Sequence, residues 1–410
     1  MPSIVSPLPP DPSTCGYCSP PGQRSKVRTN HHAACLMPVR LTCEVYRKMI
    51  DRGWRRSGEY CYKPDLKRAC CPQYTIRLDA LEFKPTKSQR KLVNRFNRWI
   101  LHGEDHEDKK KKGKANETFV LEETLHYAEH RICLEKNIEA KHKFEVTLEP
   151  SSYTYEKFTL FQKYQQDTHK EKEKMPSSFK RFLVDTPLPE ESISYTSDTS
   201  IPEHLPHTYG SYHQLYRIDG ELIAMAVLDI LPNCVSSVYF MYDSKWERFS
   251  LGKLSALREV SLAKEIHKAG AKTMGWLYMG FYIYSCPKMR YKGEYSPSYL
   301  ADPEDYSWHP LEECVPLLEK NRYACFAHPE HSIEGDYVGP PLSPDPSPSL
   351  LEKAQYLINM SRGRQPVLAP VTMMPEYLTS SSARLTLGAT IEALGEEILE
   401  DTWFYTMYEM

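Results

Sequence analysis

The chain has 410 residues, a formal net charge of −2, 26% charged residues and 40% hydrophobic residues. This composition is typical of a globular protein with two or three domains. The sequence contains no run of 18 apolar residues, which excludes a membrane-spanning helix and predicts no membrane partner. The opening MPSIVSPLPPDPS has no basic segment followed by an apolar core, so we expect no secretory signal, reduced cysteines and a cytoplasmic location, with the nucleus as a further one.

Charge is distributed unevenly along the chain. Residues 1–77 hold 13 Lys and Arg against 5 Asp and Glu, a net of +8, whereas residues 331–410 hold 4 against 11, a net of −7. A basic N-terminal third is expected to attract a polyanion such as RNA. The alternative is that these charges only solvate the surface.

The N-terminal third divides into three expected segments. The Pro- and Ser-rich residues 1–13 are predicted to be a disordered lead-in. Residues 14–95 are assigned to a cysteine-rich domain, in which apolar residues over 41–53 recur at helical spacing up to Gly53. Residues 96–140 are predicted to be a helix followed by a charged loop.

The catalytic domain is expected over residues 141–335. It begins with a strand and a helix over 144–170, and an Asp219-Gly220 turn then predicts a β-hairpin. A third β-rich run, a helix closed by glycine and a buried strand follow at 235–242, 250–270 and 276–287. Residues 336–410 are predicted to be a Pro-rich linker and an acidic tail that is dispensable for the chemistry.

This order of hairpin, strand, helix and strand resembles the core of the GNAT acyltransferase superfamily. We therefore predict an α/β (α+β) fold with a GNAT-like acyltransferase core and a cysteine-ligated N-terminal domain. The loop before the helix, Arg248 to Lys253, has one glycine where a coenzyme A loop normally has two at fixed spacing. That departure disfavours acetyl-coenzyme A, which is kept as an alternative, and favours a different acyl donor.

Four cysteines in two close pairs are the strongest candidates for metal ligands. CGYC supplies Cys15 and Cys18, and ACCPQY supplies Cys70 and Cys71. Four thiolates are the usual complement for Zn²⁺ or an iron–sulfur cluster, and free or redox-paired thiols are the third possibility. Adjacent cysteines diverge in a strand, so both thiols converge only if the backbone bends, which argues against a standard zinc ribbon.

Several long blocks resemble eukaryotic arginyl-tRNA–protein transferases, the arginyltransferases. Residues 209–243, 250–259 and 278–300 are similar to the core blocks of that family, and CGYC with CCPQYTIRL is similar to its N-terminal block. The resemblance covers roughly residues 12–90 and 140–330.

The resemblance implies transfer of arginine from arginyl-tRNA to the N-terminal amine of proteins that start with Asp, Glu or oxidised Cys. Such transfer marks acceptors for ubiquitin-dependent degradation in the N-degron pathway. The donor is an activated ester, so direct aminolysis needs no ATP, and no Walker loop occurs. The resemblance also implies an iron–sulfur cluster, as [4Fe–4S], on Cys15, Cys18, Cys70 and Cys71, with a regulatory role and zinc as the alternative. The rival from another class is a non-catalytic, metal-stabilised RNA-binding protein.

The segment SCPKMRYKGEY is the predicted substrate-binding region. An acidic acceptor side chain needs a cationic pocket, and an unpaired tRNA end can stack on aromatic rings. Lys288, Arg290, Tyr291 and Lys292 supply both kinds of side chain, with a solvated basic loop as the alternative.

Three residues of the hairpin region are candidates for catalysis. His213 is predicted to serve the acceptor pocket or proton transfer, with a satisfied sheet histidine as the alternative. Asp229 is predicted to bind the guanidinium or α-amine of the arginyl group, or else to cap the turn at Pro232. Ser237 is a candidate hydroxyl for the ester.

Tyr212 and Arg258 are further candidates for binding the substrate or the tRNA. The alternative for Arg258 is a local ion pair with Glu259.

Overall fold

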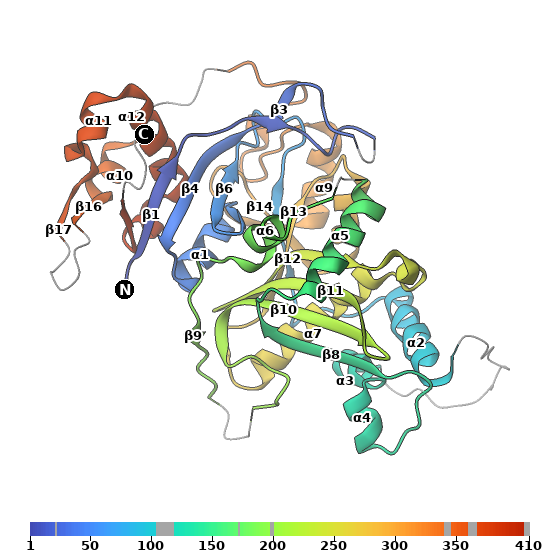
Figure 1. The fold of residues 1–410 in the computed structure, drawn as a ribbon. Coiled ribbons are helices and arrows are strands. Elements are labelled where there is room, and N and C mark those ends of the chain that lie inside the picture. The colour runs from blue at the N-terminus through green and yellow to red at the C-terminus, as the bar shows by residue number, and fades with distance from the viewer. Residues whose placement is uncertain are drawn as a thin grey trace. The chain divides into compact units, whose positions relative to one another are not determined.

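The computed structural model describes residues 1–20, 23–103, 119–170, 173–196, 201–339, 346–359 and 367–405. The charged loop predicted after the helix of 96–140 and the centre of the predicted Pro-rich linker lie outside these ranges. The chain forms two compact units, each assembled from separate segments (Figure 1). Unit 1 comprises Met1–Arg77, Asp185–Glu190 and Met279–Met410, and unit 2 comprises Leu78–Val184 and Glu191–Tyr278.

The sheet of unit 2 is built on the hairpin that the sequence predicts. Asp219 and Gly220 join strands β10 and β11 with positive φ angles of 52° and 87°, as a two-residue type I′ turn requires. Strand β12 continues the sheet antiparallel to β11, and β13 then pairs with β12 in parallel. The helix α7 lies between β12 and β13 in the chain, so a parallel crossover follows an antiparallel hairpin. The strands are β8 (Phe144–Pro150), β9 (Glu191–Ser192), β10 (Thr208–Ile218), β11 (Glu221–Leu231), β12 (Cys234–Tyr242) and β13 (Trp276–Tyr282).

Helices cover both faces of this sheet. On one face, aromatic residues of α5 pack against Leu215, Met225 and Val227. On the other face, side chains of α2 and α7 surround Tyr216 and Phe240. Apolar burial on both faces explains why β11 reads as a continuous apolar run. The helices of unit 2 are α2 (Lys87–His102), α3 (Leu121–His126), α4 (His130–Glu135), α5 (Tyr155–His169), α6 (Pro176–Phe179), η1 (Lys180–Val184), η2 (Ser244–Phe249) and α7 (Leu251–Lys268).

Unit 1 contains a seven-stranded sheet whose order mixes the two ends of the chain. The order is β17-β16-β18-β1-β4-β6-β5, with β1 parallel to β18 and antiparallel to β4. The predicted helix over 41–53 is confirmed as α1 (Cys43–Asp51), where Thr42 accepts a hydrogen bond from the Val45 N–H at 3.3 Å and Gly53 has a φ of 86°. The strands of this sheet are β17 (Val367–Pro370), β16 (Gln355–Asn359), β18 (Thr402–Phe404), β1 (Ser3–Leu8), β4 (His32–Arg40), β6 (Tyr60–Pro64) and β5 (Arg55–Ser57).

Other elements of unit 1 carry the cysteines and the basic segment. Strands β2 and β3 form a small separate sheet, and β14 pairs with β15. Strands β7 and β13 lead the chain from one unit into the other. The elements are β2 (Ser13–Thr14), β3 (Arg28–Asn30), α1 (Cys43–Asp51), β7 (Tyr74–Asp79), α8 (Pro287–Arg290), η3 (Tyr291–Glu294), β14 (Ser298–Ala301), β15 (Trp308–Pro310), α9 (Leu311–Lys320), η4 (Pro329–His331), α10 (Pro348–Lys353), η5 (Val371–Met373), α11 (Pro375–Thr379), α12 (Ser381–Leu394) and α13 (Glu396–Leu399).

The prediction of a disordered lead-in over residues 1–13 is wrong for Ser3–Leu8, which form the strand β1. Val5 is fully buried, and β1 lies between β18 and β4 in the sheet. The Pro- and Ser-rich composition is misleading because the strand is stabilised by pairing with residues almost 400 positions away.

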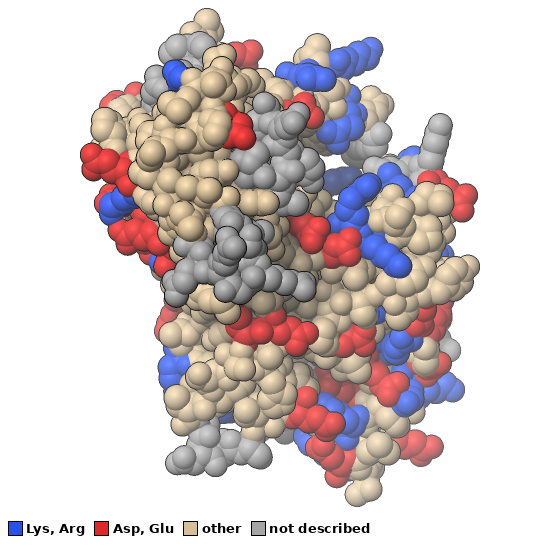
Figure 2. All heavy atoms as spheres, turned by 60° about the vertical axis from the view of Figure 1, so that its left-hand side comes forward, with Lys and Arg blue, Asp and Glu red and all other residues tan. Residues whose placement is uncertain are grey.

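No helix within the described ranges is long and apolar enough to cross a membrane. On the face drawn in Figure 2, Lys and Arg gather in small groups that alternate with groups of Asp and Glu. The net charge of −2 therefore arises from separated charges of both signs.

Candidate functional site

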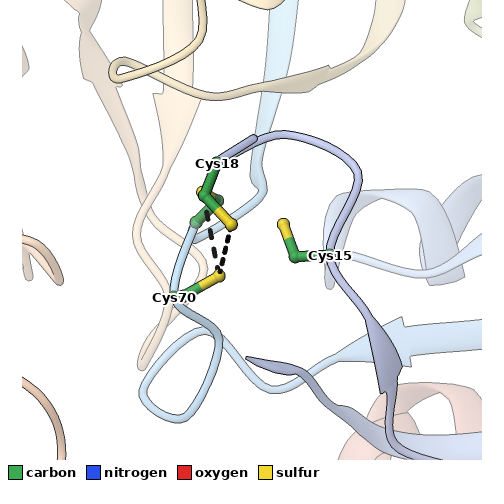
Figure 3. A group of neighbouring side chains, drawn as sticks. Cys15, Cys18 and Cys70 are labelled. Carbon is green, nitrogen blue, oxygen red and sulfur yellow. Dashed lines mark hydrogen bonds between the residues drawn. The ribbon is translucent and has the colours of Figure 1, made fainter. Parts of the chain in front are cut away.

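The four predicted cysteine ligands converge in unit 1. All four sulfur atoms lie within 4.8 Å of one another, and the Cys70 Sγ lies 3.6 Å from the Cys18 Sγ and 3.9 Å from the Cys71 Sγ. Figure 3 shows the sulfur atoms of Cys15, Cys18 and Cys70 turned toward a common point. Two loops thus bring together thiols that are more than 50 residues apart in the sequence.

Backbone bends at Cys70 and Cys71 allow the adjacent thiols to face the same point. The N–H of Cys70 donates to the Thr29 carbonyl at 3.0 Å, and the N–H of Ala69 donates to the Asp65 carbonyl at 3.0 Å. Arg322 donates to the carbonyl oxygens of Ala69 and Lys67. The bend required for convergence is therefore fixed by hydrogen bonds outside the cluster.

Burial and mutual repulsion make it unfavourable for all four cysteines of the cluster to be ionised without a bound cation. Burial raises the pKa of Cys70 to about 11, and burial together with the neighbouring Cys15 raises the pKa of Cys71. The pKa of Cys15 is lowered: its burial acts in the opposite direction, but N–H groups of Tyr17 and Cys18 outweigh it. A bound cation would offset the repulsion among the thiolates, because metal coordination deprotonates thiols. The donor set therefore fits a metal held by Cys15, Cys18, Cys70 and Cys71.

The cysteine cluster packs directly on the start of the predicted substrate segment. Cys15 and Cys71 form a buried apolar group with Ile283 and Cys286, and Met289 packs against it. Cys286 is the N-cap of α8, and the Arg290 N–H donates to its carbonyl at 2.8 Å. The cluster thus supports the turn that carries the basic residues.

Lys288, Arg290 and Tyr291 are exposed on this turn, as a binding surface requires. The Arg290 guanidinium lies 5.5 Å from the centre of the Tyr284 ring, whose hydroxyl donates to Glu319 at 2.8 Å. Arg290 also hydrogen-bonds to the Tyr284 side chain, and the five N–H donors of a guanidinium are enough to bind a carboxylate as well.

Lys292 differs from these neighbours because its amine is enclosed. The Lys292 Nζ donates to the Phe281 carbonyl at 2.7 Å. A Cβ on Gly280, which has a φ of 64°, would lie 3.8 Å from that nitrogen. Arg55 donates to the Gly280 carbonyl at 2.8 Å. Burial, with a contribution from the Arg55 charge, lowers the pKa of Lys292 to about 7, so a neutral amine is accessible near neutral pH.

The predicted catalytic histidine lies in unit 2 and is fully buried. The Nδ1 of His213 lies 3.0 Å from the Lys157 Nζ, and its Nε2 lies 2.8 Å from the Leu183 carbonyl oxygen. Lys157, which the sequence analysis missed, is itself paired with Glu149 at 2.6 Å. Both ring nitrogens of His213 are therefore engaged, which corresponds to the satisfied sheet histidine given as the alternative.

Asp229 and Ser237 lie on the neighbouring strands. Asp229 is fully buried in β11 and accepts a hydrogen bond from the Ser211 hydroxyl at 2.8 Å. Ser237, in β12, contributes a hydrogen bond to the Glu259 carboxyl, whose pKa is raised by burial. The structure thus places each in an internal hydrogen-bond network of the sheet.

Arg258 and Tyr212 are also internal. Arg258 pairs with Glu129 at 2.6 Å and donates to the Leu125 carbonyl at 2.7 Å, so its ion-pair partner is Glu129 and not the Glu259 expected from the sequence. The Tyr212 hydroxyl donates to the Thr208 carbonyl at 2.8 Å. The substrate and catalytic candidates therefore fall into two groups: those of unit 1 are exposed except for Lys292, and those of unit 2 are internal.

Comparisons with known proteins agree on one family. The family model described as "Arginine-tRNA-protein transferase, N terminus" matches residues 13–91, and "Arginine-tRNA-protein transferase, C terminus" matches residues 156–302. The Arginyl-tRNA--protein transferase 1 of Drosophila melanogaster is 30% identical over 78% of this chain and 85% of that protein. An Aspartate/glutamate leucyltransferase of Pseudomonas fluorescens is 26% identical over 63% of this chain and 80% of that protein.

Among solved structures, L-PGS from Bacillus licheniformis aligns with a TM-score of 0.25 and 12% identity over 58% of this chain and 50% of that chain. This likeness is too slight to assign a fold. The two family models, in contrast, cover the cysteine pairs, the hairpin and the basic segment, and the Drosophila relative covers 78% of the chain at 30% identity. The chain belongs to the arginyl-tRNA–protein transferase family.

Proposed function

We propose that this chain transfers arginine from arginyl-tRNA to the N-terminal amine of proteins that begin with Asp, Glu or oxidised Cys. The observation that carries the proposal is the family match over residues 13–91 and 156–302, which contain the four cysteines and Lys288 to Lys292. The enzyme class, a transferase that uses aminoacyl-tRNA, follows from the family. The acidic acceptor is supported by the exposed Arg290 and by the bacterial relative, which is named for aspartate and glutamate.

The chemistry proposed is direct aminolysis. The acceptor nitrogen attacks the carbonyl carbon of the arginyl ester, an amide bond forms, and the ester bond to the tRNA ribose breaks. The acceptor ammonium must first lose a proton, and its pKa of about 7.7–8.0 requires only mild assistance. We assign the Lys292 amine as the base that accepts this proton, because the amine is enclosed and can be neutral near pH 7. The nitrogen loses two protons in all: the departing ribose oxygen takes up one, and the other passes through Lys292 to solvent, so the lysine returns to its starting state.

We propose a GNAT-like core for unit 2. Support comes from the antiparallel order β10-β11-β12 and the parallel return to β13 through α7. Ser250, which precedes α7, adopts a left-handed conformation with a φ of 50°. The loop from Arg248 to Lys253 therefore bends sharply at a residue other than glycine, unlike the coenzyme A loops that it was compared with.

The cysteine cluster is proposed to hold a metal with a structural or regulatory role. Four thiolates on one tetrahedral ion, at a Zn–S distance of about 2.3 Å, lie about 3.8 Å apart. The separations of 3.6 Å and 3.9 Å support zinc. In a [4Fe–4S] cluster each thiolate binds a different iron, so the four sulfurs would have to move apart. Iron, sulfide and zinc analysis of anaerobically purified protein, with its visible spectrum, distinguishes the two: a broad visible absorption with iron and sulfide would favour the cluster.

A cavity of about 310 Å³ in unit 1 is the proposed binding place for the unpaired tRNA end. Its walls include Lys63, Lys67, Arg68, Tyr323 and Tyr337. Cations next to aromatic rings are the combination that binds unpaired nucleotides. Action in the cytoplasm or nucleus, ahead of ubiquitin-dependent degradation, is part of the same proposal and is drawn from the family resemblance.

The donor is tested by offering arginyl-tRNA and acetyl-coenzyme A separately to the anaerobically purified full chain with a peptide that starts with Asp. We expect a mass increase of one arginine with the tRNA, abolished by ribonuclease, and no acetylation. Acetylation, or arginine transfer that survives ribonuclease, would contradict the proposed donor.

A further inference from the structure

A second cluster of metal-ligating side chains lies in unit 2, away from the cysteines in the sequence. His126 ends α3, His204 lies in the segment before β10, and Glu265 lies on α7. One ligand atom from each lies within 4.8 Å of the other two. Since 78 and 61 residues separate the members along the chain, the convergence is produced by the fold.

The contacts centre on the Glu265 carboxylate. The His126 Nε2 lies 3.0 Å from its Oε1 and 3.2 Å from its Oε2, and the His204 Nε2 lies 2.6 Å from its Oε2. The two imidazole rings are 5.1 Å apart at an interplanar angle of 61°. Two ring nitrogens from different segments therefore face one carboxylate from different sides.

The opposite nitrogen of His126 faces a second carboxylate. The His126 Nδ1 lies 2.8 Å from the Glu129 Oε1, and Arg131 lies 3.2 Å from the same nitrogen. The ring therefore lies between the carboxylates of Glu129 and Glu265. A second proton on the ring or a cation bound at Nε2 would satisfy this arrangement.

Two of the three prospective ligands, His126 and Glu265, are also fixed by a second group. Glu129 is buried and ion-paired with Arg258 at 2.6 Å, so it holds the His126 ring in place. The Ser261 hydroxyl donates to the Glu265 Oε1 at 2.5 Å. A carboxylate that orients a histidine from behind is the usual support of a metal-binding imidazole. This support is a separate observation from the convergence of the three ligands.

We propose that His126, His204 and Glu265 bind a divalent transition-metal ion, best matched by Zn²⁺. Two imidazoles and a carboxylate, with a water in the fourth position, are an established zinc donor set. The three side chains are 20%, 29% and 15% exposed, so the site is open to solvent on one side. Tetrahedral ligands at about 2.0–2.1 Å from zinc lie about 3.3 Å apart, so entry of the ion requires only a small outward shift of Glu265. The ion would join α3 and the segment before β10 to α7. This proposal does not depend on the transferase reaction.

The test measures zinc binding by the full chain after removal and re-addition of metal. His207 is an exposed histidine three residues from His204, which makes H207Q the matched control for H204Q. Wild type and H207Q are expected to bind one more equivalent of Zn²⁺ than H204Q and E265Q, while the cysteine cluster retains its own metal in all four. Zn²⁺ beyond the first equivalent should raise the melting temperature of wild type and H207Q and leave that of H204Q unchanged. Equal stoichiometry in all four proteins would overturn the proposal and assign the cluster to proton sharing.

A second measurement uses the wild-type protein, so that its result does not depend on whether the variants fold. Co²⁺ added to wild-type protein whose cysteine cluster is already filled should give weak visible bands without the strong absorption of cobalt–thiolate bonds. Far-ultraviolet circular dichroism of metal-free H204Q and E265Q should match wild type. Cobalt absorption of thiolate type, or none, would contradict a site of two imidazoles and a carboxylate.

Discussion

The Lys292 ammonium nitrogen lies 2.7 Å from the carbonyl oxygen of Phe281. This contact holds the amine inside the turn, while Lys288 and Arg290 of the same turn remain exposed. Residues that look equivalent in the sequence are therefore suited to different tasks, one to exchanging a proton and the others to binding an anion.

Replacement of Lys292 should lower the rate of transfer more than the binding of substrate. We expect K292A and K292R to reduce kcat by about 10²–10³-fold, because general-base catalysis contributes gains of this size. Arginine keeps the positive charge but is not neutral at any working pH. Steady-state kcat and KM should be measured beside K288A, which removes an exposed lysine of the same turn and should act on KM rather than on kcat. Near-normal kcat in K292R would show that Lys292 acts only through its charge.

The pH dependence provides an independent test of Lys292. The value of kcat/KM should rise through a step near pH 7, where Lys292 loses its proton. K292A should keep only the step of the acceptor amine at about 7.7–8.0. An identical profile in both proteins would exclude Lys292 as the titrating base.

The same shift predicts how stability changes with pH. The folded-state pKa of Lys292, about 7, lies below its ordinary 10.5, so between these values the unfolded chain binds more protons and folding becomes more favourable as pH rises. Below pH 7 both states are protonated and burial of the charge costs most. The free energy of unfolding of wild type should therefore rise relative to that of K292M between pH 6.5 and pH 9, as measured by urea unfolding. A difference between the two proteins that stays constant over this range would argue against a buried charge on Lys292.

Arg290 is predicted to select the acidic acceptor. R290A should lose transfer to peptides that start with Asp, because the fork that binds both carboxylate oxygens is absent. R290K should recover only part of the activity, since a lysine does not reproduce the paired hydrogen bonds. Initial rates with a range of peptide concentrations locate the loss in KM. Unchanged transfer by R290A would remove Arg290 from the acceptor pocket.

The buried pair of Arg258 and Glu129 is predicted to stabilise unit 2. R258M should lower the free energy of unfolding by about 3–5 kcal/mol, because it leaves Glu129 buried without this partner. R131M removes a 42% exposed partner of the same carboxylate and should cost less than about 1 kcal/mol. Denaturant titrations compare the two, and a similar cost for both would contradict the burial argument.

Glu129 also predicts a loss of stability in acid. Burial opposes ionisation, but the Arg258 charge and His126 outweigh it and lower the pKa of Glu129 to about 2, against an ordinary 4.5. A lowered carboxyl pKa contributes stability above the unfolded value, and this contribution is lost as pH falls from about 4.5 to about 2. Stability differences between wild type and E129Q should shrink over that range. A difference that did not change with pH would show that Glu129 is not ionised in the fold.

Strand β1 is predicted to be essential for folding. V5D places a charge at a fully buried position and should lower the free energy of unfolding by about 3 kcal/mol or more. V39D, on the adjacent strand β4 at a position 41% exposed, is the control and should change it by about 0.5 kcal/mol. Equal, small effects in thermal and urea unfolding would restore the interpretation of residues 1–13 as a disordered lead-in.

Local signals in the sequence predicted the parts of the fold that depend on neighbouring residues. The Asp219-Gly220 turn and the helix α7 were placed correctly because turn chemistry and helical spacing act over a few residues. Strand β1 was not, because its pairing with β18 joins opposite ends of the chain. No local pattern reports such a partner.

The candidate sites likewise divide into those with a local signal in the sequence and those formed by distant segments. The four cysteines were recognisable from their spacing and from the family blocks, and the structure brings them together. The enclosure of Lys292 depends on Gly280 and Phe281, which the sequence places among many buried residues of a strand. His126, His204 and Glu265 carry no motif spacing, since three distant segments contribute one residue each.

The most direct test of the whole account is a single transfer measurement. Anaerobically purified full-length protein, arginyl-tRNA with labelled arginine, and peptides that differ only in an N-terminal Asp or Ala are combined without ATP. The account predicts label on the Asp peptide, with little on the Ala peptide and with release of uncharged tRNA in equal amount. Failure of folded, metal-replete protein to label the Asp peptide, or equal labelling of both peptides, would contradict it.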